Sequence, residues 1–236
     1  MSTRWRFPTA AVALVLLGAG LGSAPAHATT PVPTAIYLAV SVDGPIPRAG
    51  SQLTLPGALV RKDTSAGVAG VPVTVEVRQY GEAAFHAIRT VTTGSNGFFT
   101  ATYTPRHSFS YRFVFAGDAT YGASSAGSGE RVSPRVSIWL ASYDVPRGGR
   151  VVAHGRTGPN RAGHLVRLYR GQTTRGGFGP SYPAPVLLAS GRVHADGSYR
   201  LVGHARWTGG RRVFVQVGGG GGNTVGWSRY RWLTAR

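Results

Sequence analysis

Asn96-Gly97-Phe98-Phe99 recurs as Asp196-Gly197-Ser198-Tyr199, at an offset of 100 residues. Two further pairs of tetrapeptides keep nearly the same spacing: Pro47–Gly50 with Pro146–Gly149 at an offset of 99, and Arg112–Phe115 with Arg212–Val215 at an offset of 100. Three matches at nearly one offset indicate that the chain contains two copies of one domain.

The apolar residues of both copies follow the period of a β-strand. They alternate with polar residues, and no stretch sustains the three- and four-residue spacing of a helix. Asn96-Gly97 and Asp196-Gly197 predict hairpins in which both turn positions have positive φ. The predicted strands lie near 36–42, 51–55, 71–80, 85–92, 97–103, 111–116 and 126–133, and near 136–142, 149–155, 164–170, 185–194, 197–203, 211–217 and 225–233.

Seven short strands per copy predict an all-β chain of two tandem Ig-like antiparallel β-sandwiches. A single larger barrel, a transthyretin-like sandwich and a pair of fibronectin-type modules are the alternatives. The two-copy offset disfavours the barrel, and the sequence does not separate the other two. We place the sandwiches at 36–134 and 135–236, after a flexible lead-in at 29–35. Pro134 restricts the linker, so we expect a semi-rigid, end-to-end arrangement.

The segment 115–125, FAGDATYGASS, resembles the signature that joins the last two strands of bacterial Ig-like repeat domains: aromatic-x-Gly-Asp-x-x-Tyr-x-x-Ser-x-Ser. The hairpin at 95–99 is also typical of that family. The resemblance covers roughly residues 35–134, and it implies a spacer or adhesive-stalk module in which Asp118 makes a local backbone hydrogen bond. The second copy departs from the signature, because Gly218–Gly222 stand where Gly-Asp-x-x-Tyr is expected.

The N-terminus has the features of a cleaved signal peptide over residues 1–28. Two arginines precede the apolar run 10–17, and Ala26-His27-Ala28 has the small-x-small form of a cleavage site. The apolar run is shorter than the roughly 20 residues that span a bilayer. We therefore expect a mature protein that starts near Thr29 and has no membrane span. We expect it to be freely secreted, or held at the cell surface without a covalent anchor.

Charge is divided unequally between the copies. Residues 29–134 carry 8 Arg and Lys against 6 acidic residues, whereas 135–236 carry 16 Arg against Asp144 and Asp196, which gives net charges of +2 and +14. A GC-rich genome favours Arg over Lys in both copies and does not explain this difference. A field of this size attracts polyanions. We therefore expect the second sandwich to bind an anionic cell-wall or extracellular polymer.

The candidate contacts are arginines and aromatic residues of the second copy. Alternation over 227–232, WSRYRW, places Arg229 and Arg231 on one strand face and Tyr230 and Trp232 on the other. We expect the two aromatic residues to fill the core, because a last strand buries one face. The candidate anion-binding residues are Arg175, Arg206, Arg211, Arg212, Arg229 and Arg231. The candidate aromatic contacts are Phe178, Tyr182 and Trp207.

The residue inventory disfavours catalysis and metal binding. The chain has no Cys, no Gly-x-Ser-x-Gly and no His-Glu-x-x-His. A glycosidase needs two carboxyl groups at one bond, and the acidic residues are scattered. Four histidines come from separate predicted strands or strand edges, so we expect surface residues and no metal site: His154, His164, His194 and His204. We expect no enzyme activity, no cofactor, a monomer and no sequence-specific nucleic-acid binding.

Two other functional classes stay open. One is a carbohydrate- or protein-binding adhesin whose anchors are Phe178, Tyr182 and Trp207. The other is a hydrolase of an unrecognised type that depends on Asp144 or His204. The glycine run Gly218–Gly222 is expected to be a flexible connection and not a phosphate cradle, because no helix is predicted after it.

Overall fold

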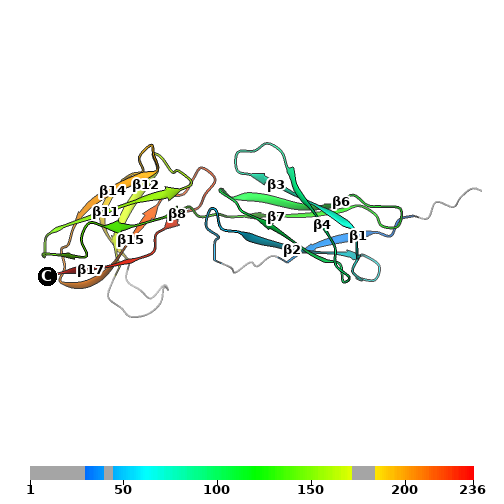
Figure 1. Ribbon diagram of the computed structural model, residues 1–236, viewed down its shortest axis with the longest axis horizontal. Coiled ribbons are helices and arrows are strands. Elements are labelled where there is room, and N and C mark those ends of the chain that lie inside the picture. Colours follow the sequence, from blue (N-terminus) through cyan, green and yellow to red (C-terminus); the bar gives the residue numbers. More distant parts are fainter. Residues whose placement is uncertain (1–29, 40–44, 172–183) are drawn as a thin grey trace, which may run out of the picture. The chain divides into compact units, whose positions relative to one another are not determined.

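The computed structural model describes residues 30–39, 45–171 and 184–236, and it contains strands and no helix in these ranges. The predicted signal peptide lies outside the described residues. The first seven strands are β1 (Thr34–Leu38), β2 (Leu53–Arg61), β3 (Pro72–Gln79), β4 (His86–Thr92), β5 (Phe98–Tyr103), β6 (Phe109–Phe115) and β7 (Ser124–Glu130). They form two antiparallel sheets, β1-β2-β5 and β4-β3-β6-β7 (Figure 1).

The later strands repeat this plan with several two-residue strands and one parallel pair. They are β8 (Arg135–Val136), β9 (Trp139–Leu140), β10 (Asp144–Val145), β11 (Arg150–Gly158), β12 (Leu165–Arg170), β13 (Val186–Arg192), β14 (Ser198–His204), β15 (Gly209–Val217), β16 (Gly226–Trp227) and β17 (Arg231–Ala235). One sheet has the order β14-β11-β8 with β9 also on β11, and the other has the order β10-β17-β15-β12-β13 with β16 on β15.

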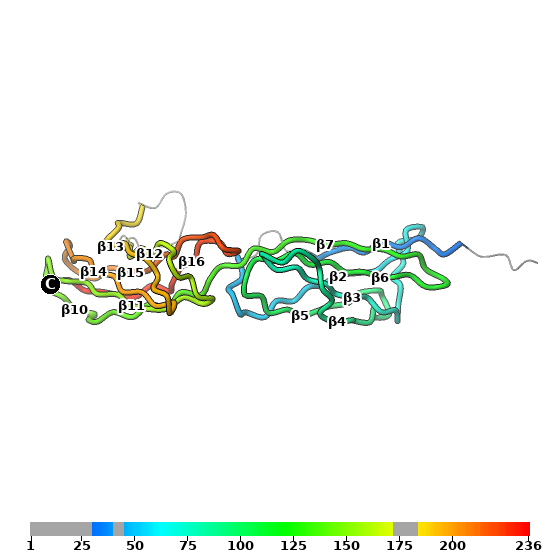
Figure 2. The backbone as a smooth tube through the Cα atoms, turned by 90° about the horizontal axis from the view of Figure 1, so that it is seen from above, coloured from blue at the N-terminus to red at the C-terminus, as the bar shows by residue number. Residues whose placement is uncertain are grey.

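The fourth long strand decides the topology of each sandwich. In the constant-type immunoglobulin arrangement it shares a sheet with the first, second and fifth strands. Here β4 pairs with β3, and its counterpart β13 pairs with β12. In the first sandwich β1 also lies beside β7, where the Thr34 hydroxyl donates to Ser124 Oγ at 2.8 Å (Figure 2). The all-β fold class is thereby confirmed, with a switched fourth strand in both sandwiches.

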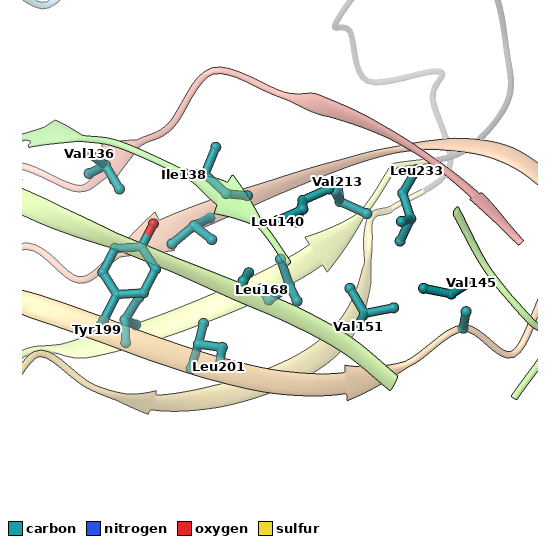
Figure 3. Packing of buried hydrophobic residues seen from close by; sticks show 14 of the residues in the cluster. Val136, Ile138, Leu140, Val145, Val151, Leu168, Tyr199, Leu201, Val213 and Leu233 are labelled. Atoms are coloured by element: carbon teal, nitrogen blue, oxygen red, sulfur yellow. The ribbon is translucent and has the colours of Figure 1, made fainter. Parts of the chain in front are cut away.

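Each sandwich has its own hydrophobic core. In the first, Phe113 is fully buried and its ring meets the Phe99 ring edge-on at a centroid distance of 4.8 Å. In the second, Tyr199, Leu168 and Leu233 lie together between the two sheets (Figure 3). Strand alternation supplies these side chains, because every second residue faces the opposite sheet.

The repeated hairpins have equivalent geometry in the two sandwiches. Only the glycine of each dipeptide has positive φ, 79° at Gly97 and 81° at Gly197. The expectation of positive φ at both turn positions is therefore wrong. Instead, Asn96 Oδ1 accepts from the Phe98 N–H at 3.2 Å, and Asp196 Oδ1 accepts from the Ser198 N–H at 3.0 Å. The side chain thus supports the turn without entering the left-handed region.

The family-like segment of the first sandwich makes the expected local contacts. Asp118 Oδ1 accepts from the N–H groups of Thr120 and Tyr121, both at 2.7 Å. Gly117 has φ of 85°, and a Cβ there would lie 2.8 Å from the Ala123 nitrogen. The predicted backbone role of Asp118 is confirmed, because its carboxylate satisfies two N–H groups of the turn between β6 and β7.

The glycine run of the second sandwich surrounds a buried arginine. Arg161 is 3% exposed, and its guanidinium donates to Gly218 O at 3.1 Å, Gly221 O at 3.5 Å and Asn223 Oδ1 at 3.2 Å. The carbonyl groups of the run, and not its N–H groups, therefore face the charged group. This orientation suits a cation and is opposite to that of a phosphate cradle.

Buried tyrosines make the fold sensitive to alkali. Burial raises the pKa of Tyr111, Tyr103 and Tyr199, with Glu130 adding to the effect at Tyr111 and Glu82 at Tyr103. The folded state then keeps protons that the unfolded state releases from about pH 10. Stability is complete below that pH and falls above it. We expect the melting temperature to fall as the pH rises from about 10 to about 12.

A tyrosine substitution tests whether these side chains cause the loss of stability at high pH. Tyr111→Phe should reduce the alkaline fall, because phenylalanine has no group to ionise, whereas Tyr143→Phe at an exposed position should leave the fall as it is. Thermal melts at matched ionic strength would measure both. An unchanged alkaline slope in Tyr111→Phe would show that other groups cause it.

Candidate anion-binding site

Two of the predicted arginines line one pocket together with two arginines that the sequence did not indicate. The pocket has a volume of about 280 Å³. We call it the arginine pocket and define it by Arg48, Arg135, Arg229, Arg231 and Trp139, with residues 136–138 completing its wall. The arginines come from three separate chain segments, so only folding brings them together.

Backbone contacts hold these arginines in place. Arg135 donates from Nη2 to Gly50 O at 2.6 Å, and Arg231 donates from Nε to Ile138 O at 3.2 Å. Arg48 forms a parallel bridge with Ser133, on the linker. Each of these arginines keeps donors beyond the contacts described, since a guanidinium carries five N–H groups.

The chain at Arg229 is positioned by its buried neighbour. Ser228 Oγ accepts from the Val215 N–H at 2.9 Å and donates to Arg229 O at 2.8 Å. Arg229 itself is exposed. Its backbone is therefore anchored while its guanidinium is accessible at the pocket.

The opposite wall of the pocket is packed against the second core. The Tyr199 hydroxyl donates to Ser137 O, and Ile138 is buried in the core cluster. Trp139 is 47% exposed, and its ring stacks on the His154 imidazole at 6.1 Å with an interplanar angle of 18°. The pocket thus combines a supported wall with one accessible aromatic ring.

The electrostatics of the pocket are uniformly positive. Both acidic residues of the second sandwich have arginine partners outside the pocket: Asp144 lies 3.5 Å from Arg236, and Asp196 lies 3.6 Å from Arg156. Within the described ranges, none of the four pocket arginines pairs with a carboxylate. Guanidinium groups without acidic partners suit carboxylate, phosphate or sulfate groups, which they bind in a bidentate manner.

The other predicted arginines do not join this pocket. Arg206 is exposed, and Arg211 donates from Nη1 to Gly210 O at 2.8 Å. Arg212 places its guanidinium carbon 4.7 Å from the centre of the Tyr230 ring. Arg175 lies outside the described residues, as do Phe178 and Tyr182.

The expectations for three aromatic residues of the second sandwich are wrong. Trp207 is 6% exposed and belongs to the second core, so it does not offer a ring to a ligand. Tyr230 and Trp232 were expected in the core, but both are exposed. The inward positions of β17 are taken by Leu233 and Ala235, and alternation therefore turns Trp232 outward.

The histidines lie in separate surroundings. Among the described residues, no group of three His, Asp or Glu side chains is placed to hold a metal ion. His164 Nδ1 lies 3.1 Å from Arg161 Nη2, and His194 Nδ1 lies 3.3 Å from Ser198 Oγ. No helix in the described ranges is long and apolar enough to cross a membrane.

Sequence patterns missed Arg48, Arg135 and Trp139. Arg48 lies in the repeated Pro-Arg turn, which signals a connection between strands but not its neighbours in space. Arg135 follows Pro134 in the linker, where no alternation indicates a face. Their position beside Arg229 and Arg231 follows from strand pairing across long sequence separations.

Several solved structures are similar to this chain, at low sequence identity and low TM-score. Red sea bream transglutaminase matches at 12% identity and a TM-score of 0.41, over 85% of this chain and 31% of its own. The fibronectin(III)-like modules of Clostridium thermocellum CbhA match at 12% identity and a TM-score of 0.28, over 85% of this chain and 92% of theirs. The Yersinia pseudotuberculosis adhesin InvE matches at 11% identity and a TM-score of 0.32, over 86% and 58%.

The chain therefore spans less than a third of the transglutaminase. Every one of these TM-scores is below 0.5, and every identity is below 25%. No protein-family model matches the chain, and no curated protein matches it.

Proposed function

We propose that this is a secreted, non-catalytic binding protein whose second sandwich binds an anionic cell-envelope or extracellular polymer. The observation that carries the proposal is the arginine pocket, which four arginines line without a carboxylate partner among the described residues. The net charge of +14 over residues 135–236 supports it, because long-range attraction raises the encounter rate with a polyanion. The first sandwich contributes Arg48 to the arginine pocket and otherwise acts as a spacer module.

Binding of this kind depends on salt. At physiological ionic strength the Debye length is about 8 Å, and at 1 M salt it is about 3 Å. The encounter between the basic surface and a polymer is therefore screened as salt rises. Arginines that form bidentate contacts with individual anionic groups contribute affinity in addition to this general attraction.

Substitution of two pocket arginines tests the proposal. We expect Arg229→Gln with Arg231→Gln to weaken the binding of long-chain inorganic polyphosphate by tenfold or more, because hydrogen bonds to charged groups contribute about 1.5–3 kcal/mol each. Isothermal titration calorimetry at 50, 150 and 500 mM NaCl would measure the affinity. The full chain is used throughout.

A matched pair controls for the loss of charge. Arg147→Gln with Arg200→Gln removes the same two charges from exposed positions outside the pocket, and it should weaken binding less than threefold. Arg229→Gln alone keeps the Arg231–Ile138 hydrogen bond and guards against an effect of misfolding. If both double variants lost the same amount of affinity, the arginine pocket would be no more than one part of a diffuse basic surface. An absence of polyphosphate binding in the unaltered protein would overturn the proposal.

A further inference from the structure

A second surface of the basic sandwich exposes aromatic rings and lies on the outer face of the sheet that contains β12, β15 and β17. Trp227 is 43% exposed, Tyr230 53% and Trp232 54%. We call this surface the aromatic face and define it by Tyr169, Phe214, Trp227, Tyr230 and Trp232. Tyr169 and Phe214 are half-buried and the other three rings are exposed. Large exposed apolar patches on a protein surface mark interaction sites.

Three of the rings form one continuous cluster. Tyr169 and Phe214 are cross-strand partners whose rings stack at 5.8 Å with an angle of 24°. The Trp227 ring lies 6.3 Å from the Tyr169 ring and 5.7 Å from the Phe214 ring. Because the rings contact one another, they form a continuous surface. A flat group can stack on this surface but cannot insert between the rings.

A glycine lets the fourth ring lie along the sheet. A Cβ on Gly210 would lie 2.4 Å from Trp232 Nε1 and 2.7 Å from Trp232 Cε2. The indole therefore crosses the neighbouring strand at close range. A ring held against the sheet in this way offers its outer face to a ligand and does not project into a bilayer.

Polar groups lie between and beside the rings. Arg167 and Gln216 are cross-strand partners on this face, and the Tyr169 hydroxyl donates to Gln216 Oε1 at 3.3 Å. Arg212 pairs with Trp232 across the strands and covers the Tyr230 ring at 4.7 Å. The face therefore offers ring surfaces, an amide and two guanidinium groups within one sheet.

Charge limits what can cover this face. A second copy would bring Arg167 and Arg212 and a net charge of +14 against the same charges, so self-association through the face is opposed by repulsion. A partner with anionic groups is complementary to it. Single-stranded nucleic acid is bound by a basic groove that follows the phosphates beside stacking rings, whereas here only two arginines accompany five aromatic residues, three of which pack against one another. Flat rings with interspersed hydrogen-bonding groups fit the faces and hydroxyls of sugars.

We propose that the aromatic face binds an acidic polysaccharide, with sugar rings stacked on Trp227 and Trp232 and carboxylate groups paired with Arg167 and Arg212. This inference rests on the proposed function, since it names the class of polyanion that the second sandwich prefers. It gives a binding role to aromatic residues that do not line the arginine pocket.

Polymers with and without rings test the inference in the full chain. The probes are polygalacturonate, which has sugar rings and carboxylates, and long-chain polyphosphate, which has charge alone. We expect Trp227→Ala with Trp232→Ala to weaken polygalacturonate binding at least tenfold and to change polyphosphate binding less than twofold. At 500 mM NaCl the unaltered protein should retain polygalacturonate better than polyphosphate, because stacking is not screened by salt.

Matched variants separate stacking from general effects. Tyr37→Ala with Phe98→Ala removes two exposed rings from the first sandwich and should change neither affinity. Trp227→Phe with Trp232→Phe keeps rings at both positions and should restore most of the polygalacturonate binding. Thermal melts check that each variant folds.

Each remaining outcome decides between the two proposals. If neither polymer binds, the proposed function fails. If both polymers bind and the tryptophan variant binds both as well as the unaltered protein does, the proposed function stands and the polysaccharide inference is overturned. Tryptophan-dependent binding of oligo(dT), or of vesicles with anionic lipid, in place of polygalacturonate would also overturn it.

Discussion

Arg161→Ala is expected to lower the free energy of unfolding by about 3 kcal/mol or more. The guanidinium is the donor to Gly218 O, Gly221 O and Asn223 Oδ1 in a site that is almost closed to water. Alanine would empty the buried space around this side chain and remove the donor to Gly218 O and Gly221 O, while Asn223 Oδ1 would keep its contact with His107 Nδ1 at 3.0 Å. Truncation of a large buried side chain costs about 2–5 kcal/mol, and a buried group that loses its partner costs about 1–3 kcal/mol. Burial lowers the pKa of Arg161, yet an arginine stays charged at any ordinary pH.

The loss should extend beyond the glycine run. Asn223 Nδ2 donates to Arg106 O at 3.1 Å and Val132 O at 3.2 Å, and the Thr224 N–H donates to Val132 O at 2.9 Å. Pro31–Arg236 form one compact unit, and these bonds link the residues that follow the run to Arg106, before β6, and Val132, after β7. We therefore expect faster hydrogen exchange at the Asn223 and Thr224 amides in the variant.

Urea denaturation and amide exchange would measure the two effects. Arg156→Ala, at an exposed arginine, should change stability by no more than about 0.5 kcal/mol. Arg161→Lys should recover little, because one ammonium group does not reproduce the planar fork that reaches several acceptors. Equal stability of Arg161→Ala and Arg156→Ala would mean that the buried network contributes nothing measurable.

Gly155→Ala is expected to lower the free energy of unfolding by about 2–3 kcal/mol and to weaken polyphosphate binding. A Cβ at this position would lie 2.1 Å from Ser137 O and 2.5 Å from Tyr199 Oη. Ser137 cannot easily yield, because its N–H donates to Arg156 O at 3.0 Å and its Oγ accepts from the Arg156 N–H at 2.9 Å. Overpacking of this kind typically costs about 1–3 kcal/mol.

The binding effect follows from the position of Ser137. It lines the arginine pocket between Arg135 and Trp139, so any shift that relieves the clash moves the pocket wall. Gly129→Ala is the matched control, since the nearest atoms to its Cβ lie 3.9 Å away. Urea denaturation and calorimetry with polyphosphate would measure both variants. Lower stability with unchanged affinity in Gly155→Ala would show that the wall does not position the arginines.

Much of the fold follows from local patterns. The alternation Val73, Val75, Val77 predicts β3, and all three side chains are fully buried in it. Arg229 and Arg231 could be named as candidates from charge and spacing alone. The outward position of Trp232 could not be predicted from the sequence. Alternation indicates that two sets of side chains lie on opposite faces of the strand, but it does not indicate which set packs against the other sheet.

The sequence alone determined the strand periods, the two copies with their equivalent turns at Gly97 and Gly197, and the unequal charge. These are local or additive properties, and they need no knowledge of which segments meet. Tertiary structure alone decided that four arginines share a pocket: Arg48, Arg135, Arg229 and Arg231. It also decided that the carbonyl groups of the glycine run accept hydrogen bonds from Arg161. Each of these depends on pairing between segments far apart in the chain, where packing and hydrogen-bond satisfaction, not local preference, select the partners.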